Sequence, residues 1–145
     1  MPSIGQVGEI GRMSEAMQDS WRAVAQDRLE AAGELLPSRR WRSVISRAYY
    51  AAYARISGAL REVGFAMPTG REGPSHGQIA EIVENNLSTV RREDRRLVSG
   101  RIRRLYNLRV MADYRPSTLV DNGEAREALR LMHDVFRMLR EAASA

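Results

Sequence analysis

One charged side chain on an otherwise apolar helix face restricts how this chain can fold. Successive residues of a helix are about 100° apart, and the face that contains Arg109 is otherwise formed by Val98, Ile102, Leu105 and Ala112. Because an unpaired buried charge is costly, Arg109 must find a partner, open onto a cleft or meet another subunit. Asp113 follows one turn later and Tyr114 comes next, at the end of a helix that must stop before Pro116.

The first half of the chain contains two further stretches with apolar residues at three- and four-residue spacing. The first of these helices is predicted to start near Ser14 and to end before Pro37, because proline interrupts a helix. The second is predicted to start with Ser38 as its N-cap and to end at Gly64, since glycine readily takes the left-handed conformation that closes a helix. Residues 64–75 then form the longest predicted loop.

The second half contains three more predicted helices, whose starts are marked by capping residues. Ser88 or Thr89 is predicted to start the long helix that carries Arg109. The other two open with a capping box, in which the first side chain caps the helix and a Glu or Gln three residues later bonds back to it. These pairs are Ser75 with Gln78, for a short helix, and Asp121 with Glu124, for the last helix.

The predicted fold is all-α: an antiparallel up-and-down bundle of four main helices plus one short helix. No stretch has the alternating pattern of a strand, and no segment repeats. A chain of 145 residues can form one domain with a real core. We expect this single helical domain to span residues 14–143, after a flexible N-terminal arm at residues 1–13 that is interrupted by glycines.

The chain is strongly basic, and all of its basic charge is arginine. It carries 23 basic and 18 acidic residues, which gives a formal net charge of +5, and it has no lysine. Nine arginines against three acidic residues lie between Arg91 and Arg115. Such a surface favours a polyanionic partner such as RNA, DNA or a nucleotide, and we expect phosphates to bind this stretch. The alternative is a solvated face with internal ion pairs.

Several functional classes are disfavoured by what the sequence lacks. There is no cysteine, so the chain forms no disulfide and no thiolate metal site, and this composition is typical of a reducing cytoplasm. No apolar run is long enough to span a membrane. A P-loop, a dinucleotide-binding glycine motif, a nucleophile elbow and a zinc-protease motif are missing, and the two histidines lie far apart. We therefore predict a cytoplasmic protein without metal or cofactor, whose role is metal-free chemistry or binding.

The segment Arg109-x-x-x-Asp113-Tyr114 carries the chemistry that remains. An arginine fork can hold a phosphate in a bidentate manner and stabilise the charge that develops when a phosphodiester is cleaved. A neighbouring tyrosine can position or deprotonate a ribose 2′-hydroxyl if its pKa allows. We therefore take Arg109, Asp113 and Tyr114 as candidate catalytic residues. The alternative is a structural ion pair between Arg109 and Asp113 that fixes the end of the helix.

Three segments, taken together, form a recognisable combination. They are Ser46-Arg47-Ala48-Tyr49-Tyr50-Ala51-Ala52-Tyr53, Ser75-His76-Gly77 and Arg109-x-x-Ala112-Asp113-Tyr114. In this order they resemble the HEPN superfamily, and in particular its small prokaryotic members with an R-x-x-A-D-Y signature. The resemblance implies a four- to five-helix bundle that pairs as a homodimer. It also implies a minimal nucleotidyltransferase as partner, with the two proteins acting as toxin and antitoxin.

Active members of this superfamily are metal-independent endoribonucleases, whose motif is an arginine followed after four to six residues by a histidine. The resemblance places Arg109 at the motif arginine, but Tyr114 follows after four residues, and no histidine comes before His133. The sequence therefore leaves open whether the chain is an enzyme. The alternative is a non-catalytic dimeric module that binds nucleotide or nucleic acid, or an accessory subunit of a nucleotidyltransferase.

The resemblance also implies roles for individual residues. In some family pairs the partner enzyme transfers AMP to a tyrosine of the motif, which implies Tyr114 as the modified residue here. Contacts to RNA phosphates are expected from arginines on two of the predicted helices. These are Arg47, Arg101 and Arg104.

Overall fold

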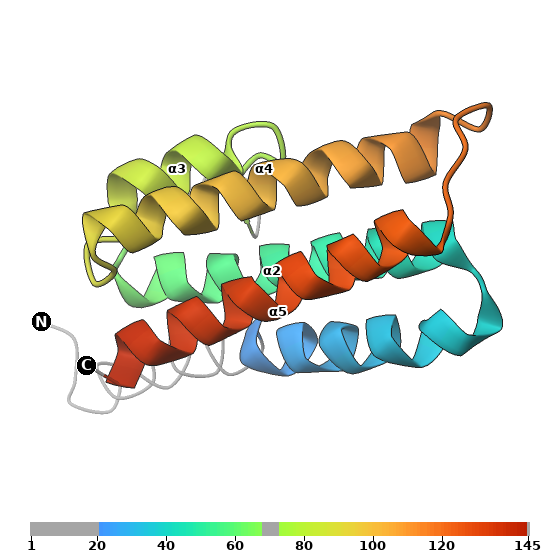
Figure 1. Cartoon of the computed structure of the whole chain (residues 1–145). Helices are drawn as coiled ribbons and strands as arrows, with labels where there is room; N and C mark the ends of the chain where they lie inside the picture. Colours follow the sequence, from blue (N-terminus) through green and yellow to red (C-terminus); the bar gives the residue numbers. More distant parts are fainter. Residues whose placement is uncertain (1–20, 68–72, 145) are drawn as a thin grey trace, which may run out of the picture.

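The structure is a computed structural model that describes residues 21–67 and 73–144 (Figure 1). The predicted arm at residues 1–13 and the predicted helix start at Ser14 lie outside the described residues. The elements are a helix over residues 21–35, a short 3-10 helix η1 (Leu36–Ser38), and the helices α2 (Trp41–Glu62), α3 (Ile79–Asn86), α4 (Arg92–Tyr114) and α5 (Asn122–Ser144). The predicted all-α fold with four main helices and one short helix is confirmed, and the described residues contain no strand.

The four long helices run up and down in sequence order, as predicted (Figure 1). The helix over residues 21–35 and α4 run in one direction, and α2 and α5 run in the other. α2 packs against α4 and α5, which also pack against each other, and the short α3 lies against α4. The bundle therefore has α2 at its centre. In the two described ranges, no helix is both long enough and apolar enough to cross a membrane.

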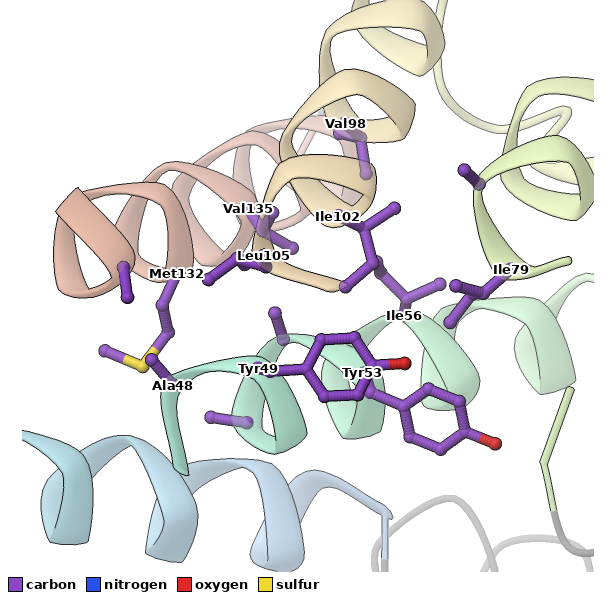
Figure 2. Packing of buried hydrophobic residues seen from close by; sticks show 14 of the residues in the cluster. Ala48, Tyr49, Tyr53, Ile56, Ile79, Val98, Ile102, Leu105, Met132 and Val135 are labelled. Atoms are coloured by element: carbon purple, nitrogen blue, oxygen red, sulfur yellow. The ribbon is translucent and has the colours of Figure 1, made fainter. Parts of the chain in front are cut away.

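The middle of α2 is buried on most of its surface, and small residues allow its neighbours to approach closely. A Cβ atom at Gly58 would lie 3.2 Å from the Cβ of Trp21, so the helix over residues 21–35 packs directly against this glycine. Tyr49 and Tyr53 are large exceptions among the small residues, and both project from α2 into the core (Figure 2). The core around them also contains Ile56 of α2, Ile79 of α3, Ile102 and Leu105 of α4, and Met132 and Val135 of α5 (Figure 2).

The predicted start of the second helix at Ser38 is wrong, while its predicted end is confirmed. α2 begins three residues later, at Trp41, because the chain first forms η1. The hydroxyl of Ser38 donates to the carbonyl of Leu35 at 2.6 Å and therefore closes the preceding turn instead of capping α2. Gly64 follows the end of α2 with φ +80°, the left-handed conformation expected of a closing glycine.

The predicted starts of the third and fourth helices are also displaced. Gln78 is the residue that precedes α3, and its backbone N–H donates to the carbonyl of Ser75 at 3.1 Å, so the expected side-chain capping box is absent there. α4 begins at Arg92 and not at Ser88 or Thr89, because the chain makes a further turn before the helix. Its end at Tyr114 agrees with the prediction that it stops before proline.

The capping box of the last helix is confirmed. The backbone N–H of Gly123 donates to the Asp121 carboxylate at 2.8 Å, and the backbone N–H of Asp121 donates to Glu124 at 3.1 Å. Interaction with the Glu124 side chain and the hydrogen bond from Gly123 lower the pKa of the Asp121 carboxyl. α5 therefore starts where the sequence predicts it.

Candidate functional site

Arg109 lies on the core-facing side of α4, as predicted, with only 9% of its surface exposed. Its Nε donates to the carboxylate of Asp113 at 3.2 Å, which is the ion pair expected from the i, i+4 spacing. Its Nη2 donates to the hydroxyl of Tyr50 at 2.8 Å and to the hydroxyl of Tyr114 at 3.2 Å. The guanidinium is therefore held by one side chain of α2, Tyr50, and by two at the end of α4, Asp113 and Tyr114.

Aromatic rings also surround this guanidinium. Its Cζ lies 5.2 Å from the ring centre of Tyr50 and 5.4 Å from the ring centres of Tyr49 and Tyr114. Burial alone would lower the pKa of Arg109, but the phenol oxygens of Tyr50 and Tyr114 and the carboxylate of Asp113 outweigh it and raise the pKa. The guanidinium is therefore positively charged at every physiological pH.

One nitrogen of Arg109 is left over. Nη1 makes no hydrogen bond with any residue in the described ranges, and it is not among their enclosed unsatisfied polar atoms. The guanidinium can therefore still donate to an incoming acceptor from a fixed position. Such a preorganised donor suits a phosphate oxygen.

Behind Arg109, the aromatic residues of α2 are tied to the segment before α3. The hydroxyl of Tyr49 lies 2.6 Å from Nδ1 of His76, and the His76 ring stacks on Tyr53 with 4.3 Å between ring centres. Tyr53 in turn donates to the carbonyl of Pro74 at 2.6 Å. Burial raises the pKa of the Tyr49 phenol, against a smaller opposing effect of Arg109. Tyr49 therefore stays protonated and can donate to His76.

A polar groove of about 410 Å³ opens beside Arg109. Residues of the first described helix, α2 and α4 line it: Arg28, Arg42, Ser43, Ser46, Arg47, Tyr50 and Asp113. The Cζ of Arg28 lies 5.4 Å from the ring centre of Tyr50. Arg47, predicted to contact RNA, is exposed here and has no hydrogen bond or ion pair within the described part of the chain. The groove therefore presents positive charge next to Tyr50 and Asp113, two of the residues that bond to Arg109.

Arg42 differs from the other arginines of the groove, because it caps the C-terminal end of α4. Its guanidinium donates to the backbone carbonyls of Met111, Ala112, Arg115, Pro116 and Thr118. The last carbonyls of a helix have no partner within it, and a cation there also interacts favourably with the helix dipole. Arg42 therefore fixes the segment that carries Asp113 and Tyr114.

The structure places the other two predicted RNA contacts elsewhere. Nε of Arg101 lies 3.0 Å from Asp134, and Nε of Arg104 lies 2.6 Å from Glu127, both on α5. The hydrogen bond from Arg104 lowers the pKa of the Glu127 carboxyl. Neither arginine lines the groove. Arg101 and Arg104 thus form internal ion pairs, as in the alternative of a solvated helix face, and their contact with RNA stays a prediction.

The structure adds four residues to the three that the sequence singled out as catalytic candidates. Tyr49 and Tyr50 were expected mainly to pack, and Arg28 and His76 were given no role in the site. The sequence pointed to His76 in one way only, because it belongs to one of the three motif segments. Within the two described ranges, no three histidine, cysteine, aspartate or glutamate side chains come together in a way that could hold a metal ion.

Comparisons with known proteins place the chain in a family of helical domains. A family model described as HEPN domain matches residues 18–142, which is most of the chain. The match includes all three motif segments, from the tyrosines of α2 to the end of α4. No curated protein and no solved structure gives a significant match.

Proposed function

The chain belongs to the HEPN domain family, and we propose that it is a toxin-like member that acts on RNA at the groove beside Arg109. The observation that carries the proposal is the guanidinium of Arg109, which is held by Tyr50, Tyr114 and Asp113 and keeps one nitrogen available. A buried cation in a fixed position is suited to one phosphate of a nucleic acid backbone.

The walls of the groove support an RNA ligand longer than one nucleotide. Arg28 and Arg47 add positive charge to the lining, and each phosphate that an arginine neutralises releases counterions and so favours binding. Ser43 and Ser46 supply hydroxyl groups that can bond phosphate or ribose oxygens. RNA is therefore a better fit to this groove than a compact anion.

We further propose that the site cleaves RNA without a metal. In this reaction the ribose 2′-oxygen attacks the adjacent phosphorus, the bond to the 5′-oxygen breaks, and a 2′,3′-cyclic phosphate remains. Arg109 would stabilise the charge on the phosphate oxygens. Asp113 would accept the 2′-hydroxyl proton through Oδ1, since its hydrogen bonds with Arg109 and Ser46 both use Oδ2. Tyr114 would donate a proton to the leaving 5′-oxygen.

The proposed partners follow from the family and from the exposure of one residue. Tyr114 is 65% exposed, so its hydroxyl can be reached by a second protein. We propose a homodimer that is neutralised by a nucleotidyltransferase-type antitoxin, with Tyr114 as the tyrosine that receives AMP. Modification there would place a negative phosphate beside Arg109 and compete with RNA.

The test is an RNA cleavage assay in EDTA with the purified full chain. Wild type, Arg109→Ala and Arg103→Ala are incubated with total RNA and tRNA, and the product ends are analysed. Arg103 is the matched control, because it is an exposed arginine on the same helix outside the groove. We expect wild type and Arg103→Ala to leave 2′,3′-cyclic phosphate ends and Arg109→Ala to be inactive although folded. Equal cleavage by all three proteins would refute the proposal.

A second function is favoured by the position of the histidines. His76 is bonded to Tyr49 and stacked on Tyr53, so it does not lie in the groove, and His133 is an exposed residue of α5. Among the described residues, the usual general base is therefore absent beside Arg109. RNA or nucleotide binding without cleavage would support a non-catalytic module, or an accessory subunit of a nucleotidyltransferase.

A further inference from the structure

A second pocket, the Trp41 pocket, lies at the start of α2, at the same end of the bundle as the connection from α4 to α5 (Figure 1). Its volume is about 370 Å³, and its lining is Arg39, Arg40, Trp41, Arg42, Ser43 and Val120. Arg42 and Ser43 also line the groove beside Arg109, so the pocket and the groove are neighbours with a common wall. A ligand that extends past this wall would enter the Trp41 pocket.

Trp41 is the aromatic residue of this lining, and its indole is accessible. The side chain is half-buried and packs in part against the hydrophobic core. Its N–H makes no hydrogen bond in the described ranges and is not among their enclosed unsatisfied polar atoms, so a ligand can reach it. No ring or guanidinium of those ranges lies over the indole, whereas Trp21 contacts Tyr53 and Arg61. Trp41 therefore offers a fixed aromatic surface.

The lining of the Trp41 pocket is positively charged. Arg39 and Arg40 are exposed, and their side chains make no hydrogen bond or ion pair within the described ranges. None of the lining residues is acidic, and the first turn of α2 contains no acidic residue. Asp121, which follows Val120, accepts a hydrogen bond from the backbone at the start of α5 and is not part of the lining. The two exposed arginines are thus available to phosphates.

The wall between the pocket and the groove is held in place by Arg42. Its guanidinium donates to backbone carbonyls of the connection after α4, as far as that of Thr118, two residues before Val120. Arg42 is therefore committed to the protein and fixes both sides of the pocket. Trp41 and Arg47 are six residues apart on α2, which corresponds to about 9 Å along the helix axis. A short segment of extended RNA can cover this span.

We propose that the Trp41 pocket is a second subsite for single-stranded RNA, where a nucleobase stacks on the indole and Arg39 and Arg40 bind flanking phosphates. This inference rests on the proposed action on RNA at the groove beside Arg109. An aromatic ring beside cationic side chains holds unpaired bases with little regard to their sequence. A compact anion would make no use of the indole. The pocket therefore favours unpaired RNA over a duplex, whose bases are stacked on each other.

The first test observes Trp41 directly. The chain contains two tryptophans, so Trp21→Phe leaves Trp41 as the only one and keeps a ring at position 21. We expect single-stranded RNA to quench the fluorescence of this protein, because a stacked base lies against the indole. Inorganic polyphosphate is the matched probe, since it offers phosphates without bases, and it should leave the fluorescence nearly unchanged. Equal quenching by both probes, or no quenching by RNA that is bound, would overturn the proposal.

The second test measures the affinity of full-length variants for a labelled single-stranded RNA by fluorescence anisotropy. We expect Trp41→Leu to weaken binding by about tenfold and Trp41→Phe, which keeps a ring, to weaken it less. Leu119→Ala is the control, because Leu119 is an 82% exposed apolar residue beside Val120 that does not line the pocket. Duplex RNA of the same length should distinguish the variants less. Circular dichroism confirms that each variant is folded.

The variants distinguish the Trp41 pocket from the groove beside Arg109. Weaker RNA binding by Arg47→Gln but not by Trp41→Leu would overturn the Trp41 subsite and leave the proposed groove in place. Weaker binding by Trp41→Leu but not by Arg47→Gln would overturn the groove, and with it the continuous path that the second subsite requires. Equal weakening by Trp41→Leu and Leu119→Ala would overturn the stacking role of Trp41, and no RNA binding by wild type would overturn both proposals.

Discussion

The hydroxyl of Tyr50 accepts a 2.8 Å hydrogen bond from Nη2 of Arg109 and so joins the middle of α2 to the last turns of α4. The two residues are 59 positions apart in the sequence. The bond uses a neutral acceptor, and the only carboxylate hydrogen-bonded to Arg109 within the described ranges is that of Asp113. Asp113 therefore supplies the negative charge beside Arg109, and the two tyrosine hydroxyls add neutral acceptors.

Removing the hydroxyl of Tyr50 should weaken this link without removing the ring. We expect Tyr50→Phe to lower the free energy of unfolding by about 2 kcal/mol, because the lost bond has a charged donor. Arg109→Ala should cost about 3 kcal/mol, since it also leaves the Asp113 carboxylate unpaired. Urea unfolding monitored by circular dichroism measures both values. A stability of Arg109→Ala equal to that of wild type would show that the cluster does not hold the bundle together.

Parts of this cluster could be predicted from the sequence, and the reason is local spacing. Asp113 lies one turn from Arg109 on the same helix, so periodicity alone pairs them. Tyr50 and His76 reach the cluster only through tertiary packing, and no spacing rule links residues so far apart. The buried position of Arg109 was predictable from the sequence. Its bond to Tyr114 depends on the geometry at the end of α4, and its bond to Tyr50 depends on how α2 and α4 pack, so neither could be predicted from spacing.

The helix starts likewise divide into those that the local sequence predicts and those that tertiary packing decides. The last capping box was predictable because Asp121 and Glu124 bond within four residues. Ser38 has the right residue type for an N-cap, but Arg39 takes a left-handed conformation with φ 60° and the chain completes a 3-10 turn first. Ser75 likewise offers its backbone carbonyl and not its side chain to Gln78. A capping residue type marks a turn reliably, but tertiary packing decides whether a helix starts there.

Arg47 gives a direct test of the groove as an RNA interface. We expect Arg47→Gln to weaken binding of a short single-stranded RNA and to reduce the dependence of log K on log salt by about one. Arg103→Gln removes the same charge from an exposed position outside the groove and should change the slope less. Fluorescence anisotropy at several salt concentrations measures both. Equal slopes for the two variants would place the RNA elsewhere on the basic surface.

Arg42 should affect the site although its hydrogen bonds are to backbone atoms. We expect Arg42→Gln to destabilise the fold by about 2 kcal/mol, because several carbonyls at the end of α4 lose a charged donor. The end of α4 should then open more often and carry Asp113 and Tyr114 away from Arg109. Hydrogen exchange of the amides at the end of α4 checks this. Unchanged protection together with normal RNA cleavage would show that Arg42 is dispensable for both.

The buried phenol of Tyr49 predicts a stability loss in alkaline solution. Burial raises its pKa above the usual value of 10.0, so the folded state keeps the proton when the unfolded state has released it. The stabilisation is complete below about pH 10 and is lost at about 1.4 kcal/mol per pH unit above it, until the pH passes the folded pKa. Tyr49→Phe should lack this contribution. Urea unfolding of both proteins from pH 8 to 11 measures the difference, and parallel curves would contradict the prediction.

Gly73 should be intolerant of a side chain because of its contact with Tyr53. A Cβ at Gly73 would overlap the Tyr53 hydroxyl and lie 3.0 Å from its Cζ, so the ring would have to move and lose its hydrogen bond to Pro74. We expect Gly73→Ala to destabilise the fold by about 2 kcal/mol, or about 6 °C in Tm for a domain of this size. Gly77→Ala is the control, since nothing lies within 4 Å of its added Cβ, and its Tm should stay close to that of wild type. Because the moved ring would also leave His76 without its stacking partner, the His76 resonances should shift in Gly73→Ala alone. Similar Tm values for the two variants would mean that Tyr53 can move at little cost and that it does not anchor His76 behind Arg109.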